Sequence, residues 1–540
     1  VYAFPDAQLG DIPCTVHLVA GTESPFYETD VEIDISLSLN QFGYPITGIN
    51  IKSSPMIADL DGNSYSEIYF GGEDDKLHGY MIAGMTQYGF PFECGGNVRS
   101  SPAGGDVDGD GDNEIVFGSH DGNLYILSTT GIQELAYTQA GYIVGAPALF
   151  DLDGDEDLEI IFTTQNGSNG KVYAIHHDGN DVDGFPADIS EKMLVGAAVG
   201  DLEGDGSPDI VVVTWEDHIY AFNADGTTKS GFPFLASNRF NSPATLVDLD
   251  DDGDLEIVAG NDDGDLYILH HDGSVMTTFS TGDDIRGGIS VADVNDDGSK
   301  ELLFVGYDDL LHVWNPASGE ELEGWPFDLG YNSLSGPITA DLDNDGDLEI
   351  VAAMKSGTVF VFHHDGSMFN NFPTNFAGNI ESTPTVGDLD NDGDFELVFG
   401  TTQGLQVIDI KSNAGSRDSW KMHRGNLYRN GLYDITLVSI EPDEDLLPGE
   451  FFVSQNYPNP FNPTTHVNIQ LPEQNNLIVS IYNVSSRLIN TLVNEKLDAG
   501  FYSIEWNGKD KFGQVVPTGV YFLKVVSGDF TATKKMVYIK

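Results

Sequence analysis

Basic residues, cysteines and long apolar runs are all scarce in this chain of 540 residues. It has only 23 lysines and arginines against 87 aspartates and glutamates. Nucleic-acid binding needs a basic stripe, and attraction to an anionic membrane surface needs the same sign of charge. No apolar run reaches the ~18 residues that a membrane-spanning helix requires. We therefore expect no nucleic acid partner and no membrane insertion.

The two cysteines, Cys14 and Cys94, could form a disulfide or remain free thiols, and the sequence leaves both readings open. There is also no initiator methionine and no signal peptide at the start. Residues 1–41 include an alternating polar and apolar stretch that is typical of a strand. We expect this region to be the tail of a preceding β domain or an N-terminal extension, within a longer precursor.

What the chain does have is an acidic pattern, D-x-D-x-D-G-x-x-E, that recurs eight times at intervals of 45 to 50 residues. The clearest copy occupies residues 341–349. A fixed period of this size indicates one supersecondary unit used repeatedly, as in a propeller or a solenoid. The copies begin at Asp59, Asp106, Asp151, Asp201, Asp248, Asp293, Asp341 and Asp388.

The density of carboxylates in each copy predicts a bound cation. Two like unit charges about 4 Å apart repel by roughly 1 kcal/mol even in water, and a hard divalent cation turns this repulsion into binding. Calcium accepts six to eight oxygen ligands in irregular geometry, so we expect up to eight Ca²⁺ ions. The alternative is that the copies are only acidic, Asx-rich turns. The expected metal ligands, at positions 1, 3, 5 and 9 of each copy, are Asp59, Asp61, Asn63, Glu67, Asp106, Asp108, Asp110, Glu114, Asp151, Asp153, Asp155, Glu159, Asp201, Glu203, Asp205, Asp209, Asp248, Asp250, Asp252, Glu256, Asp293, Asn295, Asp297, Glu301, Asp341, Asp343, Asp345, Glu349, Asp388, Asp390, Asp392 and Glu396.

These loops are not EF-hands, which place a glutamate at position 12 and are flanked by helices. Position 12 is apolar in every copy here, and the acid at position 9 opens a β-type run such as residues 114–118. Each loop is therefore expected to join two strands. Asn63, Glu203 and Asn295 depart from the consensus, so we expect tighter binding at the copies that begin at 106, 248, 341 and 388.

Each repeat reads as four short strands, which is typical of a propeller blade. A proline precedes the first strand, Asp-Gly turns follow the second and third, and a Gly-Phe-Pro motif marks the fourth. We expect an all-β fold with an eight-bladed β-propeller, or seven-bladed as the alternative, followed by a small Ig-like β-sandwich. The motif at 43–45 precedes the first loop, which predicts an N-terminal strand that closes the ring. Residues 419–433 are expected to cap the last blade.

On these motifs, residues 42–433 resemble the FG-GAP/VCBS repeat family, whose calcium loops are similar to those of the integrin α-subunit propeller. The resemblance implies a calcium-binding propeller. It leaves the ligand of that propeller unassigned.

The composition changes after Tyr433. Residues 434–450 form an acidic linker, and residues 451–540 contain further strands. This last region resembles the type A C-terminal sorting domain of the type IX secretion system in the Bacteroidota and related phyla, through residues 455–463, 506–508, 519–521 and 534–536. The resemblance implies recognition by the secretion machinery and a secreted or outer-membrane, cell-surface location. An ordinary Ig-like module is the alternative.

No nucleophile elbow, P-loop or dinucleotide-binding turn occurs, so no catalytic residue is predicted. Histidine pairs at 176–177, 270–271 and 363–364 recur at one blade position, which favours packing and turn roles over a shared zinc site.

The sequence favours a calcium-stabilised, cell-surface adhesion module that binds protein or glycan without catalysis. The alternatives are a polysaccharide lyase-type enzyme and an accessory region of a larger secreted hydrolase such as a protease. A lyase for polyanionic uronates would need a basic cleft, yet the first 450 residues contain 15 basic and 81 acidic residues.

Overall fold

The computed structural model describes residues 10–20, 27–37, 39–433, 451–453, 461, 465–471 and 474–539, except 64, 140, 156, 168, 418, 486, 498–499, 513 and 529. The chain divides into two compact units near residue 439, and each is described here by itself. The described residues are all-β apart from one 3-10 turn, η1 (Ile82–Gly84). No helix among them is long and apolar enough to span a membrane. The expected linker at 434–450 lies outside the described residues.

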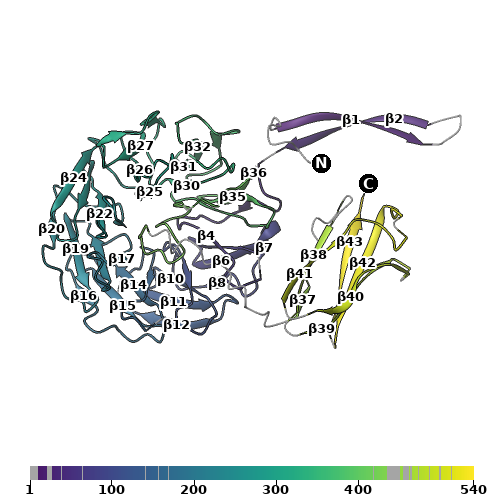
Figure 1. Cartoon of the computed structure of the whole chain (residues 1–540), viewed down its shortest axis with the longest axis horizontal. Coiled ribbons are helices and arrows are strands. Elements are labelled where there is room, and N and C mark those ends of the chain that lie inside the picture. Colours follow the sequence, from purple (N-terminus) through teal and green to yellow (C-terminus); the bar gives the residue numbers. More distant parts are fainter. Residues whose placement is uncertain are drawn as a thin grey trace. The chain divides into compact units, whose positions relative to one another are not determined.

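Eight antiparallel sheets succeed one another between residues 46 and 413 and are arranged around a common centre (Figure 1). Each contains one acidic loop, between its first and second strands. Sheet 1 consists of β4 (Met56–Ala58), β5 (Glu67–Gly71), β6 (Lys76–Met81), β7 (Met85–Thr86) and β8 (Phe92–Glu93), and sheet 2 of β9 (Ala103–Gly105), β10 (Glu114–Gly118), β11 (Asn123–Ser128) and β12 (Gln133–Thr138). Sheet 3 consists of β13 (Ala148–Phe150), β14 (Glu159–Thr164), β15 (Lys171–Ile175) and β16 (Ala187–Asp188), and sheet 4 of β17 (Ala198–Gly200), β18 (Asp209–Val213), β19 (His218–Asn223) and β20 (Phe234–Leu235).

The second half of the ring repeats this order. Sheet 5 consists of β21 (Thr245–Val247), β22 (Glu256–Gly260), β23 (Asp265–Leu269) and β24 (Val275–Ser280), and sheet 6 of β25 (Ser290–Ala292), β26 (Glu301–Val305), β27 (Leu310–Asn315), β28 (Glu320–Glu321) and β29 (Phe327–Asp328). Sheet 7 consists of β30 (Ile338–Ala340), β31 (Glu349–Ala353), β32 (Thr358–Phe362) and β33 (Thr374–Asn375), and sheet 8 of β34 (Thr385–Gly387), β35 (Asp394–Thr401), β36 (Gly404–Asn413) and β3 (Ile46–Thr47).

The second strand of each sheet is apolar because both of its faces are covered by neighbouring sheets. In β10, Ile115 and Phe117 pack in one cluster with Met56 of sheet 1. Val116, which points to the opposite face, packs in another cluster with Phe162 of sheet 3. Successive sheets therefore share their cores face to face.

The N-terminal strand closes the series, as predicted. Ile46 and Thr47 of β3 pair with Leu405 and Gly404 of β36, so the start of the chain completes the last sheet. Gln41, which precedes β3, also lies beside β36, because its backbone N–H donates to the carbonyl of Val407 at 2.9 Å.

Residues 419–433 do not cap the last sheet, and that prediction was wrong. The segment crosses the centre of the ring, where its backbone carbonyls accept hydrogen bonds from the first strands of six different sheets. A short, polar, glycine-containing sequence gave no sign of this role, since its partners lie up to about 300 residues away in the chain. The donors are the backbone N–H groups of Gly104, Leu149, Val199, Leu246, Thr339 and Val386, at 2.8–3.1 Å.

Two buried arginines anchor this central segment. Arg429 is fully buried and donates to the carbonyls of Pro55 and Pro102 at 3.0 Å each. Arg424 donates to the carbonyls of Arg429, at 2.7 Å, and of Ala197. Burial lowers the pKa of each guanidinium to about 9. Both still carry charge near neutral pH, and peptide carbonyls replace their lost hydration.

The C-terminal unit is a two-sheet sandwich, in agreement with the prediction. Its core contains Val467, Leu477, Trp506 and Leu523 from both sheets. Of the expected sorting motif at 455–463, only Phe461 is described, and its ring lies 5.3 Å from that of Trp506. The sheets consist of β37 (Phe452–Val453), β38 (Thr465–Leu471) and β41 (Gly500–Trp506), and of β40 (Leu488–Leu497), β39 (Asn475–Asn483), β42 (Gly519–Ser527) and β43 (Phe530–Tyr538).

The N-terminal region forms a hairpin of β1 (Gly10–Ala20) and β2 (Tyr27–Leu37), paired antiparallel along their full length. Its origin as a tail or an extension stays a prediction.

Cys94 has a free thiol, and burial raises its pKa to about 12, so this cysteine is a poor nucleophile at neutral pH.

Candidate metal sites

Six of the eight acidic loops bend twice through the left-handed region of backbone space, at positions 4 and 6. Position 6 is glycine in most copies, as at Gly111 with φ of 95°. Position 4 is also left-handed, as at Gly109 with φ of 69° and Asn344 with φ of 58°. Only glycine, asparagine and aspartate adopt this conformation readily, and position 4 is one of these three in every copy. The sequence analysis missed this second bend, although the residue types there could have shown it.

Backbone amides hold the loop carboxylates inward. In the second loop, the amides of Asp110 and Gly111 donate to the two oxygens of Asp106 at 3.2 and 2.9 Å. The amide of Asp112 donates to Asp110 at 2.9 Å. These Asx-type bonds fix positions 1 and 5 in each other's vicinity, which is the arrangement that an ion bound by both would need.

The acid at position 9 is buried in all eight sheets, with at most 3% of its surface exposed. In loops 2 to 8, one of its oxygens accepts a bond from the backbone N–H of position 2, as Glu349 does from Leu342 at 2.7 Å. Burial, opposed by that bond, raises the pKa of Glu349 to about 8. The same combination raises the pKa of Glu114 to about 8. A buried carboxylate with a raised pKa lacks a compensating positive charge.

The structure brings three of the four predicted ligands together in each of the first three loops. In the first, second and third loops, one ligand atom from each residue of the group lies within 4.8 Å of all the others. Ligands 2.3–2.6 Å from one calcium ion would have such separations. Position 7 joins the third group although it was not predicted. The groups are Asp59, Asp61 and Glu67; Asp106, Asp108 and Glu114; and Asp153, Asp155, Asp157 and Glu159.

Several loop oxygens are buried without a hydrogen-bond partner, which is the clearest sign that the donor set suits a cation. They include Oδ1 of Asp248, of Asp343 and of Asp390. An unsatisfied buried carboxylate oxygen costs roughly 1–3 kcal/mol or more. A hard ion such as Ca²⁺ would satisfy these oxygens.

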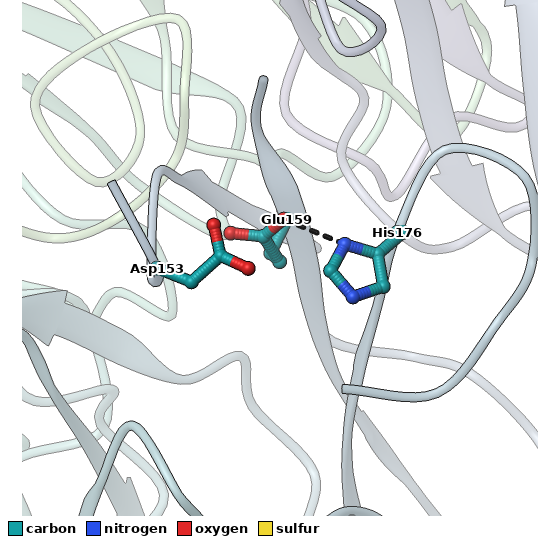
Figure 2. Close-up of side chains that lie close together, drawn as sticks. All are labelled: Asp153, Glu159 and His176. Carbon is teal, nitrogen blue, oxygen red and sulfur yellow. Dashed lines mark hydrogen bonds and ion pairs between the residues drawn. The ribbon is translucent and has the colours of Figure 1, made fainter. Parts of the chain in front are cut away.

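The histidine pairs contact the loops, so the expectation of packing and turn roles alone was incomplete. Nδ1 of His176 lies 3.0 Å from Oε1 of Glu159, beside Asp153 (Figure 2). His363 makes the same 3.0 Å contact with Glu349. The antiparallel register explains this, because the end of the third strand lies opposite the start of the second. The three pairs lie on separate sheets, at the ends of β15, β23 and β32.

Other side chains contact the loops from the segment that leads into the fourth strand of the sheet, and the sequence analysis missed all of them. Nε2 of Gln41 donates to Asp390 at 2.7 Å. In the fourth loop, Nζ of Lys229 donates to both oxygens of Asp209 at 2.8 Å and also to Glu203. The fourth loop therefore already contains a cationic group among its predicted ligands.

Comparison with known families assigns two parts of the chain. FG-GAP-like repeats match residues 151–212, 201–259, 293–352 and 341–399, and the FlgD Ig-like domain matches residues 455–529. The chain is thus an all-β protein that carries four recognised FG-GAP-like repeats on propeller-like sheets, followed by an Ig-like domain. No curated protein matched the chain.

Solved structures resemble the chain in fold alone. Sqt1 of Saccharomyces cerevisiae is 12% identical and has a TM-score of 0.51, with 68% of this chain and 98% of that one covered. The quinohemoprotein alcohol dehydrogenase of Comamonas testosteroni is 11% identical, with a TM-score of 0.47 and coverage of 69% and 75%. The biofilm matrix protein Bap1 of V. cholerae is 12% identical, with a TM-score of 0.40 and coverage of 89% and 91%.

Proposed function

We propose that the chain is a calcium-stabilised β-propeller of eight blades, one per loop-bearing sheet, that acts outside the cell as a non-catalytic adhesion or binding module. The observation that carries the proposal is the burial of the ninth-position acid in all eight sheets, next to further carboxylates of its own loop. Removing a charge from water costs several kcal/mol unless an opposite charge is supplied. Calcium supplies it at the loops that hold no cationic side chain of their own.

Chelation tests this role. Ions that bind the folded state alone stabilise it by RT ln(1 + [L]/Kd), which is about 4 kcal/mol per site at a thousandfold excess over Kd. We expect EDTA to lower the melting temperature by more than ~10 °C and calcium to restore it fully. Magnesium should restore less, because it requires strict octahedral geometry. A melting temperature that EDTA does not change would refute the proposal.

A polar groove of about 330 Å³ next to sheets 2 and 3 supports a glycan or other hydroxylated ligand. Tyr142 lines it, is 52% exposed and stacks on His120 at 5.0 Å between ring centroids. Nε2 of His120 and Oε1 of Gln139, also in its lining, are buried without hydrogen-bond partners. An aromatic face beside unsatisfied polar atoms suits a sugar ring.

A glycan array with the full chain in calcium tests this groove. We expect binding to fall at least tenfold in Tyr142→Ala and to be unchanged in Tyr331→Ala, which removes a similarly exposed tyrosine elsewhere. Equal binding by both variants would place the ligand on another surface. An array on which the chain binds no glycan would favour a protein ligand instead.

The lyase alternative is disfavoured because three arginines of the repeat region are paired with acids. Arg99 bonds to Glu73 at 2.5 and 2.9 Å, and Arg239 and Arg286 both bond to Asp262. Paired guanidinium groups leave little positive potential for a polyanionic uronate. An ultraviolet assay for unsaturated uronate products should stay negative. The accessory-region alternative would be supported by a hydrolase domain upstream of Val1 in the precursor.

We further propose that residues 451–540 direct export through the type IX secretion machinery. The motif residues named above support this proposal, and the Ig-like match supports only the fold. A fluorescent reporter fused to this unit should reach the surface of a bacterium that has the system. The matched control replaces Lys534 and Lys535 by alanine. Equal export by both fusions, or retention of both, would count against the assignment.

A further inference from the structure

One repeat position reaches into the acidic loop of its own sheet. It lies four residues before the proline of the Gly-aromatic-Pro motif, which is Asn-Phe-Pro in sheet 7, and we call it the approach position. In six sheets its backbone N–H donates to a carbonyl of the third strand at 2.8–2.9 Å, so these residues are structurally equivalent. They are Gln41 in sheet 8, Gln87 in sheet 1, Val182 in sheet 3, Lys229 in sheet 4, Leu322 in sheet 6 and Phe369 in sheet 7.

The side chain at the approach position contacts the loop wherever it is polar. Gln41 donates to Asp390, the third-position acid of its loop, at 2.7 Å. Lys229 contacts the third-position Glu203 and the ninth-position Asp209. Lys229 is only 7% exposed, so its ammonium is held among these carboxylates rather than in solvent.

The fourth loop is also built differently from the other seven. It has the longer acid, Glu203, at position 3 and the shorter acid, Asp209, at position 9, whereas the others have aspartate or asparagine at position 3 and glutamate at position 9. The shortened ninth residue leaves space beside the second strand, and the ammonium of Lys229 fills it, 2.8 Å from both carboxylate oxygens. Loop and lysine therefore fit one another.

We infer that Lys229 is a tethered cation that holds the fourth loop closed to divalent ions, and that the approach position determines which loops bind calcium. This inference rests on the proposed calcium role of the other loops. A calcium ion 2.3–2.6 Å from the oxygens of Asp209 would lie next to the ammonium, and the two positive charges would repel strongly in this low-dielectric site. The lysine supplies one positive charge to Glu203 and Asp209 at any calcium concentration.

Exchanging lysine and glutamine between two approach positions tests the inference. Bound calcium per folded chain is measured by elemental analysis after equilibration in a calcium buffer. We expect Lys229→Gln to bind one ion more than the wild type, with a larger rise of melting temperature on adding calcium. Gln41→Lys should bind one ion less, because its lysine would reach the eighth loop as Lys229 reaches the fourth. The double exchange should restore the wild-type count.

Lys171→Gln serves as the control, since Lys171 pairs with Asp188 at 2.9 Å and contacts none of the proposed ligands. It should leave the count unchanged. If Lys229→Gln and Gln41→Lys both fold and both bind the same number of calcium ions as the wild type, this inference is overturned while the calcium proposal stands. If Lys229→Gln does not fold, Gln41→Lys decides, and its unchanged count overturns the inference. A wild type that binds no calcium would refute the calcium proposal itself, together with this inference.

Discussion

The backbone N–H of Thr383 donates to the hydroxyl of Ser54 at 2.9 Å, across 329 positions of the sequence. The backbone N–H of Ser54 in turn donates to the hydroxyl of Ser101 at 2.8 Å. Each bond joins the entrance of one first strand to that of the adjacent sheet. The Ser54–Thr383 contact joins the last sheet to the first, as the Ser54–Ser101 contact joins the first to the second.

Ser54→Ala should destabilise the ring by about 1–3 kcal/mol, because it leaves the buried N–H of Thr383 without an acceptor. Urea unfolding in saturating calcium measures the loss. Ser230→Ala, at an exposed position, should stay within ~0.5 kcal/mol of wild type. Equal stability of the two variants would show that this closure contact contributes nothing.

Arg429→Met should destabilise the first unit by more than ~3 kcal/mol, because the carbonyls of Pro55 and Pro102 would lose their buried donors. Arg429→Lys should not rescue it, since an ammonium cannot copy the planar fork of a guanidinium. Urea unfolding followed by tryptophan fluorescence measures both. Arg487→Met, on the surface of the other unit, is the control. Full rescue by lysine would contradict the anchoring role of the guanidinium.

His312 should make stability depend on alkaline pH. Burial disfavours its charged form, but bonds to Asp308 at 3.1 Å and Glu321 at 2.6 Å outweigh burial and raise its pKa to about 9. A raised pKa means that the contribution is complete below the unfolded-state value near 6.5 and is lost as pH rises through about 9. Its size is on the order of 3 kcal/mol.

The measurement compares wild type with His312→Gln in saturating calcium between about pH 6 and pH 10. The difference in unfolding free energy should be largest near pH 6, shrink between about pH 6.5 and pH 9, and be lost above that range. A difference that stays constant over this range would mean that His312 contributes by packing against Phe304 rather than by charge.

Without calcium, the buried acids should reverse the usual effect of mild acid. Burial, with smaller contributions from Asp390, Asp409 and Asp394, raises the pKa of Glu396 to about 10. The folded state then holds a proton that the unfolded state releases above about pH 4.5, so its stability falls as pH rises toward 10.

We therefore expect the EDTA-treated protein to melt several degrees higher at pH 5.5 than at pH 8, and Glu396→Gln to reduce this difference. In calcium the trend should vanish or invert, because the ion replaces the proton on the carboxylates. An EDTA-treated protein that is more stable at pH 8 would argue that these acids are ionised without a cation.

The local parts of this protein could be predicted from the sequence because their information is local. Nine residues specify each acidic loop, and the apolar run after Glu114 or Glu349 specifies the buried strand that leaves it. The recurrence of one pattern at a fixed period then indicated the repeated sheet. The closing strand was also accessible, since residues 43–45 repeat a motif found in the later sheets.

The partners of the loops were decided only by the tertiary structure. His176 meets Glu159 because strand register places the end of one strand opposite the start of another, and Lys229 reaches Asp209 from 20 residues further along the chain. Residues 419–433 fill the centre because eight first strands converge there and offer N–H and carbonyl groups that need partners. Such pairings depend on which polar groups, far apart in the sequence, lack hydrogen-bond partners once the ring has closed. A local sequence pattern cannot predict them.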